Sequence, residues 1–349
     1  MAFVDKYMRI KGSLLGIDIG YNSIKIVSLA KKGDANFLKS YNIATIPPKS
    51  LQQKQNDSQK IAEAIKTALN TARPKIYEKL AVSGLPESKV FTKIIQVPLM
   101  TDQELETAVP SEAARHIPIP PGEIYLDWQN LGQNEKKALD ILIVAAPKYL
   151  VDNHIQVFKI VGLELIALET KPIAAARAII KKNDVQTILI LDIGAEATSI
   201  SIVDFGSIKF TYTIPHGGNT LTKSISDSLK IPLDKAEKLK RESGFRTDDH
   251  PETIKAMELV MNDILEEVNN AIKFYESRTK PARKILEVRT CGGAALTPEI
   301  ASYVAEATGI KTNIANPLIN ISGINWKKIA KEEIFRLTTA VGLALRERY

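Results

Sequence analysis

The sequence predicts an α/β protein built from two like domains. The first observation is a pair of similar segments, LGIDIG at residues 15–20 and ILDIGA at residues 190–195. Each is an apolar run typical of a buried strand, ends in Asp-x-Gly and is followed by a second apolar run. The second observation is the alternation of strand-like and helix-like segments along all 349 residues, a length sufficient for two or more hydrophobic cores.

Composition excludes several classes of protein. Hydrophobic residues make up 44% of the chain and charged residues 25%, as in soluble globular proteins. The single cysteine, Cys291, excludes an intramolecular disulfide and a cysteine-cluster metal site. The net charge of +7 is spread, and aromatic residues do not alternate with basic ones, so we expect no nucleic-acid groove. With no signal-peptide core and no apolar run of about 20 residues, a cytoplasmic location is expected.

In the first half, we expect a strand hairpin at 17–29, a third strand at 37–46 and a helix capped by Asp57 and Ser58. A strand follows at 80–82. The segment from about 85 to 147 has the character of an insertion, with strands at 90–97, 124–128 and 138–145. Its helix opens with the capping box Thr101-x-x-Glu104, and Pro110 is expected to kink or split it. Helices at 149–161 and 171–181 end this half.

In the second half, a strand at 187–193 precedes strand pairs up to residue 214, and helices follow over 219–243. A long helix is predicted at 252–278, because its apolar residues recur at three- and four-residue steps. After a strand ending at Thr290, Thr297 and Pro298 are expected to open a helix. The last helix is expected from 328 to the last residue. No Gly/Ser-rich linker separates the halves, so we expect a hinge.

The first Asp-x-Gly hairpin suits a phosphate site. Gly20 permits close approach of backbone N–H groups to an anion, and Asp18 can hold a hydrated magnesium ion. Lys25, on the second strand, can face the same phosphates. An ordinary hairpin with a solvated lysine is the alternative interpretation.

Three further elements have comparable chemistry. Asp192 and Gly194 repeat the hairpin, with Thr198 and Ser199 placed to reach a phosphate or its water. The glycine pair 217–218 opens a helix, where an anion can bind, although a plain turn is the alternative. The pair 292–293 follows a strand and leaves room for a flat base and ribose. His216 and Cys291 are interpreted as structural.

In this order, the four elements resemble the superfamily of actin, sugar kinases and heat-shock ATPases, over nearly the whole chain. The resemblance implies an actin-like (ribonuclease H-like) two-domain fold that binds ATP with Mg²⁺ in the cleft between the domains. The residues that match the phosphate-1 motif are Asp18, Gly20, Tyr21, Asn22, Ser23 and Lys25. Those that match phosphate-2 and the following helix start are Asp192, Gly194, Ala195, Thr198, Gly217, Gly218 and Asn219. The adenosine motif matches Gly292, Gly293 and Ala294, while Glu237 and Lys240 lie where relatives contact the nucleoside. Asp18 and Asp192 are the implied metal contacts.

One position departs from the superfamily pattern. Residues 169–176 and 339–344 resemble the two connector helices across the hinge. Relatives that hydrolyse ATP well place Glu or Gln before the proline of the first connector, where this chain has Lys171. A charged lysine accepts no proton, so weak or absent ATPase activity is expected.

The insertion resembles subdomain 1C of the FtsA/PilM branch, and residues 314–318 resemble a segment of the PilM family of type IV pilus assembly proteins. The resemblance implies subdomain 1A at 13–85 and 148–182, 1C at 86–147, 2A at 187–220 and 286–349, and 2B at 221–285. It also implies a cytoplasmic adaptor at the inner membrane. This adaptor holds the N-terminal tail of PilN in a groove between 1A and 1C, and links PilN and PilO to the motor ATPases.

Two other functions stay open at this point. An FtsA-like filament-forming ATPase is the first, although the expected end of the chain at Tyr349, on the second connector, leaves no membrane-binding tail. A small-molecule kinase is the second, but no substrate-side aspartate stands out as its base.

Overall fold

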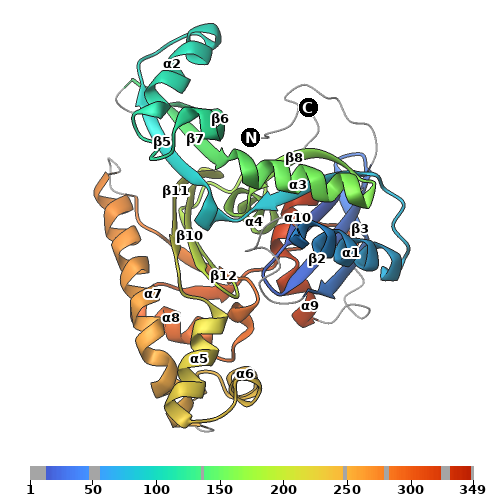
Figure 1. Cartoon of the computed structure of the whole chain (residues 1–349). Coiled ribbons are helices and arrows are strands. Elements are labelled where there is room, and N and C mark those ends of the chain that lie inside the picture. Colours follow the sequence, from blue (N-terminus) through green and yellow to red (C-terminus); the bar gives the residue numbers. More distant parts are fainter. Residues whose placement is uncertain are drawn as a thin grey trace. The chain divides into compact units, whose positions relative to one another are not determined.

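The computed structural model describes residues 13–46, 56–134, 137–246, 250–278, 283–323 and 331–346, with the backbone alone for 56, 57 and 331. The chain divides into two compact units. Unit 1 comprises the described residues of Met1–Ala178, Leu318–Asn325 and Thr339–Tyr349, and unit 2 those of Ile179–Pro317 and Trp326–Thr338. Figure 1 shows the chain and labels many of the helices and strands of both units.

Unit 1 contains a five-stranded sheet in the order β3-β2-β1-β4-β8. Its strands are β1 (Leu15–Ile19), β2 (Ser23–Lys32), β3 (Ala35–Thr45), β4 (Leu80–Leu85) and β8 (Glu164–Thr170). The first three strands form an antiparallel meander, and β4 runs parallel to both β1 and β8. The hairpin predicted from the first Asp-x-Gly segment is therefore confirmed at the centre of this sheet.

Helices cover both faces of the unit 1 sheet. Successive side chains of a strand point to opposite faces, and both faces of β1 are buried. Leu15 and Ile17 of β1 pack with α1 (Asn56–Thr71) and α3 (Lys148–Val161) in one core. Leu14 and Val82 belong to a second core, with residues of α4 (Lys171–Ile179) and α10 (Thr338–Ala344).

A separate three-stranded antiparallel sheet, in the order β5-β7-β6, lies within residues 91–147. Its elements are β5 (Phe91–Val97), α2 (Asp102–Ala114), β6 (Ile124–Gln133) and β7 (Leu139–Pro147). Thr101 and Glu104 form the predicted capping box at the start of α2. Pro110 was expected to kink or split this helix. A split is wrong, because α2 continues through Pro110 while Leu105, Val109 and Ala113 stay buried against the small sheet.

Unit 2 repeats the sheet arrangement of unit 1. Its strand order is β11-β10-β9-β12-β13, again an antiparallel meander followed by two parallel strands. The strands are β9 (Ile188–Ile193), β10 (Thr198–Asp204), β11 (Ser207–Ile214), β12 (Glu287–Cys291) and β13 (Thr312–Ile314). The two similar segments of the sequence thus occupy the same place, the central strand, in two sheets of one design.

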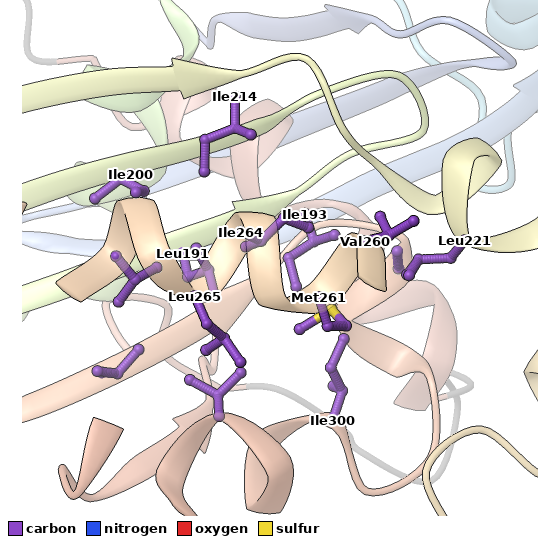
Figure 2. Close-up of a cluster of buried hydrophobic side chains, with 14 of the residues drawn as sticks. Leu191, Ile193, Ile200, Ile214, Leu221, Val260, Met261, Ile264, Leu265 and Ile300 are labelled. Carbon is purple, nitrogen blue, oxygen red and sulfur yellow. The ribbon is translucent and has the colours of Figure 1, made fainter. Parts of the chain in front are cut away.

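The core of unit 2 is formed largely by one helix, α7 (Pro251–Arg278). Met261, Ile264 and Leu265 of this helix pack with Leu191 and Ile193 of β9 (Figure 2). The three- and four-residue spacing that predicted the helix also supplies its buried face. The described residues of this unit also form α5 (Gly218–Leu229), α6 (Leu233–Glu242), α8 (Ile300–Thr308) and α9 (Lys331–Arg336).

Some helix boundaries differ from the predictions. Helix α1 begins at Asn56, so Asp57 and Ser58 lie in its first turn rather than before it. Thr297 ends the short 3-10 helix Ala294–Leu296, and α8 begins three residues later, after Glu299. A 3-10 turn after the glycine pair uses the residues that were expected to cap α8.

The end of the chain was expected to be one helix of the second half. The described part forms two, α9 (Lys331–Arg336) and α10, while residues 328–330 and 347–349 lie outside the described residues. Residues 339–346 group with unit 1, because Gly342 of α10 packs directly on the Ala174 carbonyl of α4. The four subdomain boundaries themselves stay predictions.

Candidate functional site

The β1–β2 hairpin positions the first set of predicted site residues, in unit 1. Asp18 and Lys25 are cross-strand partners, and the N–H of Gly20 donates to the carbonyl of Ser23 at 2.9 Å to close the turn. A Cβ on Gly20 would lie 2.9 Å from both Lys25 Nζ and the Ser23 oxygen. Glycine is favoured here chiefly because the Ser23 carbonyl is backbone and cannot move aside as the lysine head group can.

Asp18 is buried between two lysines. Lys25 Nζ lies 3.1 Å from Oδ2, and Lys171 Nζ lies 2.7 Å from Oδ1. Lys171 also donates to the carbonyl of Ile19 at 2.9 Å, which fixes its head group. Burial raises the pKa of Asp18, but the charges of Lys171 and Lys25 outweigh it and hold that pKa well below its usual range. We call Asp18, Gly20, Lys25 and Lys171 the unit 1 site.

The unit 1 site fits an anion better than a cation. Two ammonium groups flank one carboxylate, and their side chains keep 16% and 22% exposure against 6% for Asp18. The positive groups are thus the accessible ones, which suits a phosphate. A divalent metal at Asp18 would stand beside both ammonium groups and be repelled by them.

The other predicted residues of this hairpin have mixed positions. Tyr21 is half-buried, Asn22 is exposed and Ser23 is buried. The Asn22 carbonyl accepts from the N–H of Ile46 at 3.1 Å. These contacts hold the turn, and the exposed Asn22 side chain is available to a ligand.

The second hairpin is bonded to the start of α5 in unit 2. The Gly194 N–H donates to the Ala197 carbonyl at 3.0 Å, and the Gly194 carbonyl accepts from Gly218 at 2.8 Å. The Ala195 carbonyl accepts from Asn219, also at 2.8 Å. A Cβ on Gly217 would lie 2.7 Å from the Ala195 oxygen. Phosphate-2 and the Gly-Gly helix start therefore form one compact backbone structure.

The fourth predicted element joins the same place. Gly292 has φ of +87° in the turn after β12, and a Cβ there would overlap Asp192 Oδ1 and the Ile193 carbonyl. Ala294 lies close to Gly218, because a Cβ on Gly218 would be 3.1 Å from that of Ala294. Gly293 is exposed, with open space where its Cβ would be.

Lys240 and Glu237 of α6 also reach this cluster. Lys240 is buried, and its Nζ donates to the Gly218 carbonyl at 2.8 Å, to Thr222 Oγ1 at 2.6 Å and to Glu237 Oε2 at 2.7 Å. Burial raises the pKa of Glu237, but the bonds from Lys240 and Thr222 outweigh it and lower that pKa overall. We call the cluster formed by residues 192–195, 217–219 and 292–294 with Thr222, Glu237 and Lys240 the unit 2 site.

Two residues predicted to contact the nucleotide make hydrogen bonds within the protein instead. Thr198 is fully buried, and its hydroxyl donates to the His216 carbonyl at 2.7 Å. Asn219 donates from its side chain to Glu196 at 2.5 Å. Thr198 therefore holds the segment before α5 in place and presents no surface to a ligand.

Burial, with a smaller effect of the Asp192 charge, raises the pKa of the Cys291 thiol, in keeping with a structural role.

Sequence reasoning missed two members of the sites. Lys171 was considered for hydrolysis, but its ion pair with Asp18 joins residues 153 positions apart, which no local pattern indicates. Thr222 lies four residues after Gly218 on α5, and this helical spacing could have signalled that they share a face. Among the described residues, no group of three or more His, Cys, Asp or Glu side chains could hold a metal ion.

Solved structures define the class of the fold. The chain is similar to MreB5 of Spiroplasma citri bound to AMPPNP, with a TM-score of 0.53 and 15% identity over 95% of each chain. It is more similar to the PilM-PilN type IV pilus biogenesis complex, with a TM-score of 0.82, 25% identity and coverage of 97% of this chain and 99% of that one. The predicted actin-like fold is thus confirmed.

The family follows from the sequence itself. The model of the family described as type IV pilus assembly protein PilM matches residues 16–348, so the chain belongs to this family. Curated relatives are the cell division proteins FtsA, among them that of Neisseria meningitidis serogroup B, with 28% identity over 43% of this chain and 40% of FtsA. The match to FtsA of Bacillus subtilis (22% identity) covers 59% of this chain and 54% of FtsA. The chain therefore spans about half the length of these two relatives. Within the described residues, no helix has the length and apolar character needed to cross a membrane.

Proposed function

We propose that this protein is an ATP-binding, actin-like adaptor of type IV pilus assembly. It binds the N-terminal cytoplasmic segment of PilN and, through PilN and PilO, couples the inner-membrane complex to the pilus motor ATPases. The observation that carries this proposal is the family match over residues 16–348, together with the likeness to a PilM-PilN complex over 97% of the chain.

Nucleotide binding is supported by the backbone of the unit 2 site. Gly217 and Gly292 stand where any side chain would collide with the hairpin, so the three segments pack backbone against backbone at the start of α5. The N-terminus of a helix is a place where an anion can bind. Asp192 at the end of β9 is the carboxylate we assign to a magnesium ion carried by the nucleotide. In unit 1, the ammonium groups of Lys25 and Lys171 beside Asp18 are of the kind that binds phosphate.

Hydrolysis is proposed to be slow or absent. In relatives that hydrolyse ATP, a Glu or Gln before the connector proline orients the attacking water. Lys171 occupies that position here and is held by Asp18 and the Ile19 carbonyl, so it neither accepts a proton nor turns toward a water. Nucleotide would then act mainly by favouring one conformation.

The family resemblance assigns the PilN segment to a groove between subdomains 1A and 1C. In unit 1 the corresponding elements are the five-stranded sheet with its helices and the β5-β7-β6 sheet with α2. PilN would hold this protein at the cytoplasmic face of the inner membrane.

Co-purification tests the PilN assignment. The N-terminal cytoplasmic segment of PilN, fused to a soluble carrier, is expected to co-elute with this protein in size-exclusion chromatography with ATP present. The same carrier with a scrambled segment is the control and is expected to elute alone. Separate elution of both fusions, with and without ATP, would contradict the proposal.

An FtsA-like filament is the second candidate, favoured by the match to FtsA of Streptococcus pneumoniae, with 23% identity over 88% of this chain and 76% of FtsA. Sedimentation distinguishes the two functions. The adaptor is expected to stay in the supernatant with ATP and Mg²⁺, whereas ATP-dependent pelleting would favour a filament.

A further inference from the structure

The unit 1 site contains its own cation where an actin-like protein is expected to use a metal. Asp18 is the carboxylate that the phosphate-1 motif offers to Mg²⁺, but both of its oxygens already have ammonium partners. The pairing of Lys25 with Asp18 is a result of the hairpin register, because the two residues lie directly opposite each other on β1 and β2. Lys171 comes from a different element, the first residue of α4.

The position of Lys171 is held by several contacts. Its aliphatic part crosses Gly84 of β4, where a Cβ would lie 3.1 Å from Lys171 Cγ. Its head group bonds to Asp18 and to the Ile19 carbonyl at 2.7 and 2.9 Å. A positive charge in the first turn of a helix is disfavoured by the helix dipole, so the pairing with Asp18 compensates a local electrostatic cost.

The charges at the site favour a metal-free mode of binding. A divalent ion bound to Asp18 would stand beside two ammonium groups and be repelled by both. A phosphate, by contrast, meets two partly exposed ammonium groups. Their combined charge of two is only half neutralised by the single carboxylate of Asp18. No rearrangement of Asp18 is needed for the anion to bind.

We propose that the Lys171 ammonium group takes the place of a divalent metal at Asp18, so that the first hairpin binds nucleotide phosphate through two lysines. This inference rests on the proposed nucleotide binding and adds its ionic requirement. The unit 1 site then needs no divalent metal to bind phosphate.

The test compares AMPPNP affinity in excess EDTA and in excess Mg²⁺, measured by calorimetry for the wild type and Lys171→Met. The variant is expected to lose about tenfold or more in EDTA, because a charged contact to phosphate is gone. In Mg²⁺ it is expected to come within about threefold of the wild type, because Asp18 is then free to hold the metal.

Two further variants make the comparison specific. Lys171→Glu places a second carboxylate beside Asp18 and is expected to bind AMPPNP only with Mg²⁺. Lys39→Met removes the same charge from β3 of unit 1, where Lys39 pairs with Glu78 at 2.5 Å, and is expected to behave as the wild type in both buffers. Near-ultraviolet circular dichroism checks that each variant is folded.

Four results would overturn the inference. Equal loss for Lys171→Met in EDTA and Mg²⁺, or no loss in EDTA, would show that Lys171 does not replace a metal. If the wild type binds AMPPNP only with Mg²⁺, as expected for Lys171→Glu, the inference is also contradicted. The proposed nucleotide binding would still stand. Failure of the wild type to bind AMPPNP in either buffer would refute both.

Discussion

At the scale of residues, Lys240 joins three parts of the unit 2 site. It connects the Gly218 carbonyl of α5, the Thr222 hydroxyl and the Glu237 carboxylate through one buried head group. The sequence suggested Glu237 and Lys240 as nucleoside contacts. Their ion pair is local to α6, at i,i+3 spacing, but the bonds of Lys240 to Gly218 and Thr222 depend on how α6 packs on α5, which the sequence does not indicate.

We predict that Lys240→Met lowers the free energy of unfolding by about 2 kcal/mol, because Glu237 and Thr222 lose a charged partner in a mostly buried place. Nucleotide affinity is expected to fall as well, because the start of α5 is no longer held. Chemical denaturation and calorimetry measure the two effects. Lys238→Met on the exposed face of the same helix is the control, expected within about 0.5 kcal/mol of the wild type. Equal stability of the two variants would refute this role for Lys240.

A second prediction concerns His154 of α3, which is buried and bonds through Nδ1 to the Leu150 carbonyl at 2.8 Å. Burial lowers its pKa to about 4, and the charges of Lys171 and Lys89 act in the same direction. The unfolded chain therefore binds this proton more readily, at its ordinary pKa of about 6.5. As the pH is lowered from 6.5 to 4, His154 should therefore reduce the free energy of unfolding by about 1.4 kcal/mol for each pH unit. Above pH 6.5 this group should have no effect on it.

Denaturation at a series of pH values checks this. His154→Asn is expected to lose that part of the pH dependence, whereas His116→Gln, a half-buried histidine of the same unit, should retain it. The same slope in the wild type and His154→Asn would contradict the assignment.

At the scale of elements, the connector helices α4 and α10 meet through small residues. Gly342 of α10 lies against the Ala174 carbonyl of α4, and Gly16 of β1 lies against the Ala340 carbonyl of α10. Both segments were identified in the sequence by their resemblance to connector helices. The sequence did not indicate that Arg177 of α4 would bridge buried Glu169 and the Gly342 carbonyl, at 2.8 Å to each.

We predict that Gly342→Ala destabilises the protein by about 3 kcal/mol or more, because the added methyl group overlaps a backbone carbonyl that cannot move without shifting α4. Thermal or chemical unfolding measures the change. Gly122→Ala has open space around its Cβ and is the control, expected within about 1 kcal/mol of the wild type. A neutral Gly342→Ala would mean that α4 and α10 are not packed this closely.

Element types were predicted better than their ends. The two central hairpins, the long helix α7 and the Thr101 capping box follow from patterns a few residues long. The start of α8 did not follow, because the turn after Gly292 and Gly293 continues into a 3-10 helix that uses Thr297. Packing decided this boundary against a good local cap.

At the scale of the whole molecule, the duplication seen in the sequence becomes two sheets with the same strand order, each with Asp-x-Gly at the end of its central strand. The two copies have different chemistry. The unit 1 site pairs its aspartate with two lysines, while the unit 2 site is built from glycine backbone and the Lys240 network. The repeat thus predicted the fold, and the contacts between distant residues define what each site can bind.

The central claim is that nucleotide and PilN binding belong to one adaptor. It is tested most directly by titrating a fluorescent peptide of the PilN N-terminal segment into this protein, with and without saturating AMPPNP. We predict binding in both conditions and an affinity that AMPPNP changes by about fivefold or more, as expected for coupled sites. An affinity that AMPPNP leaves unchanged, or no binding in either condition, would contradict the account.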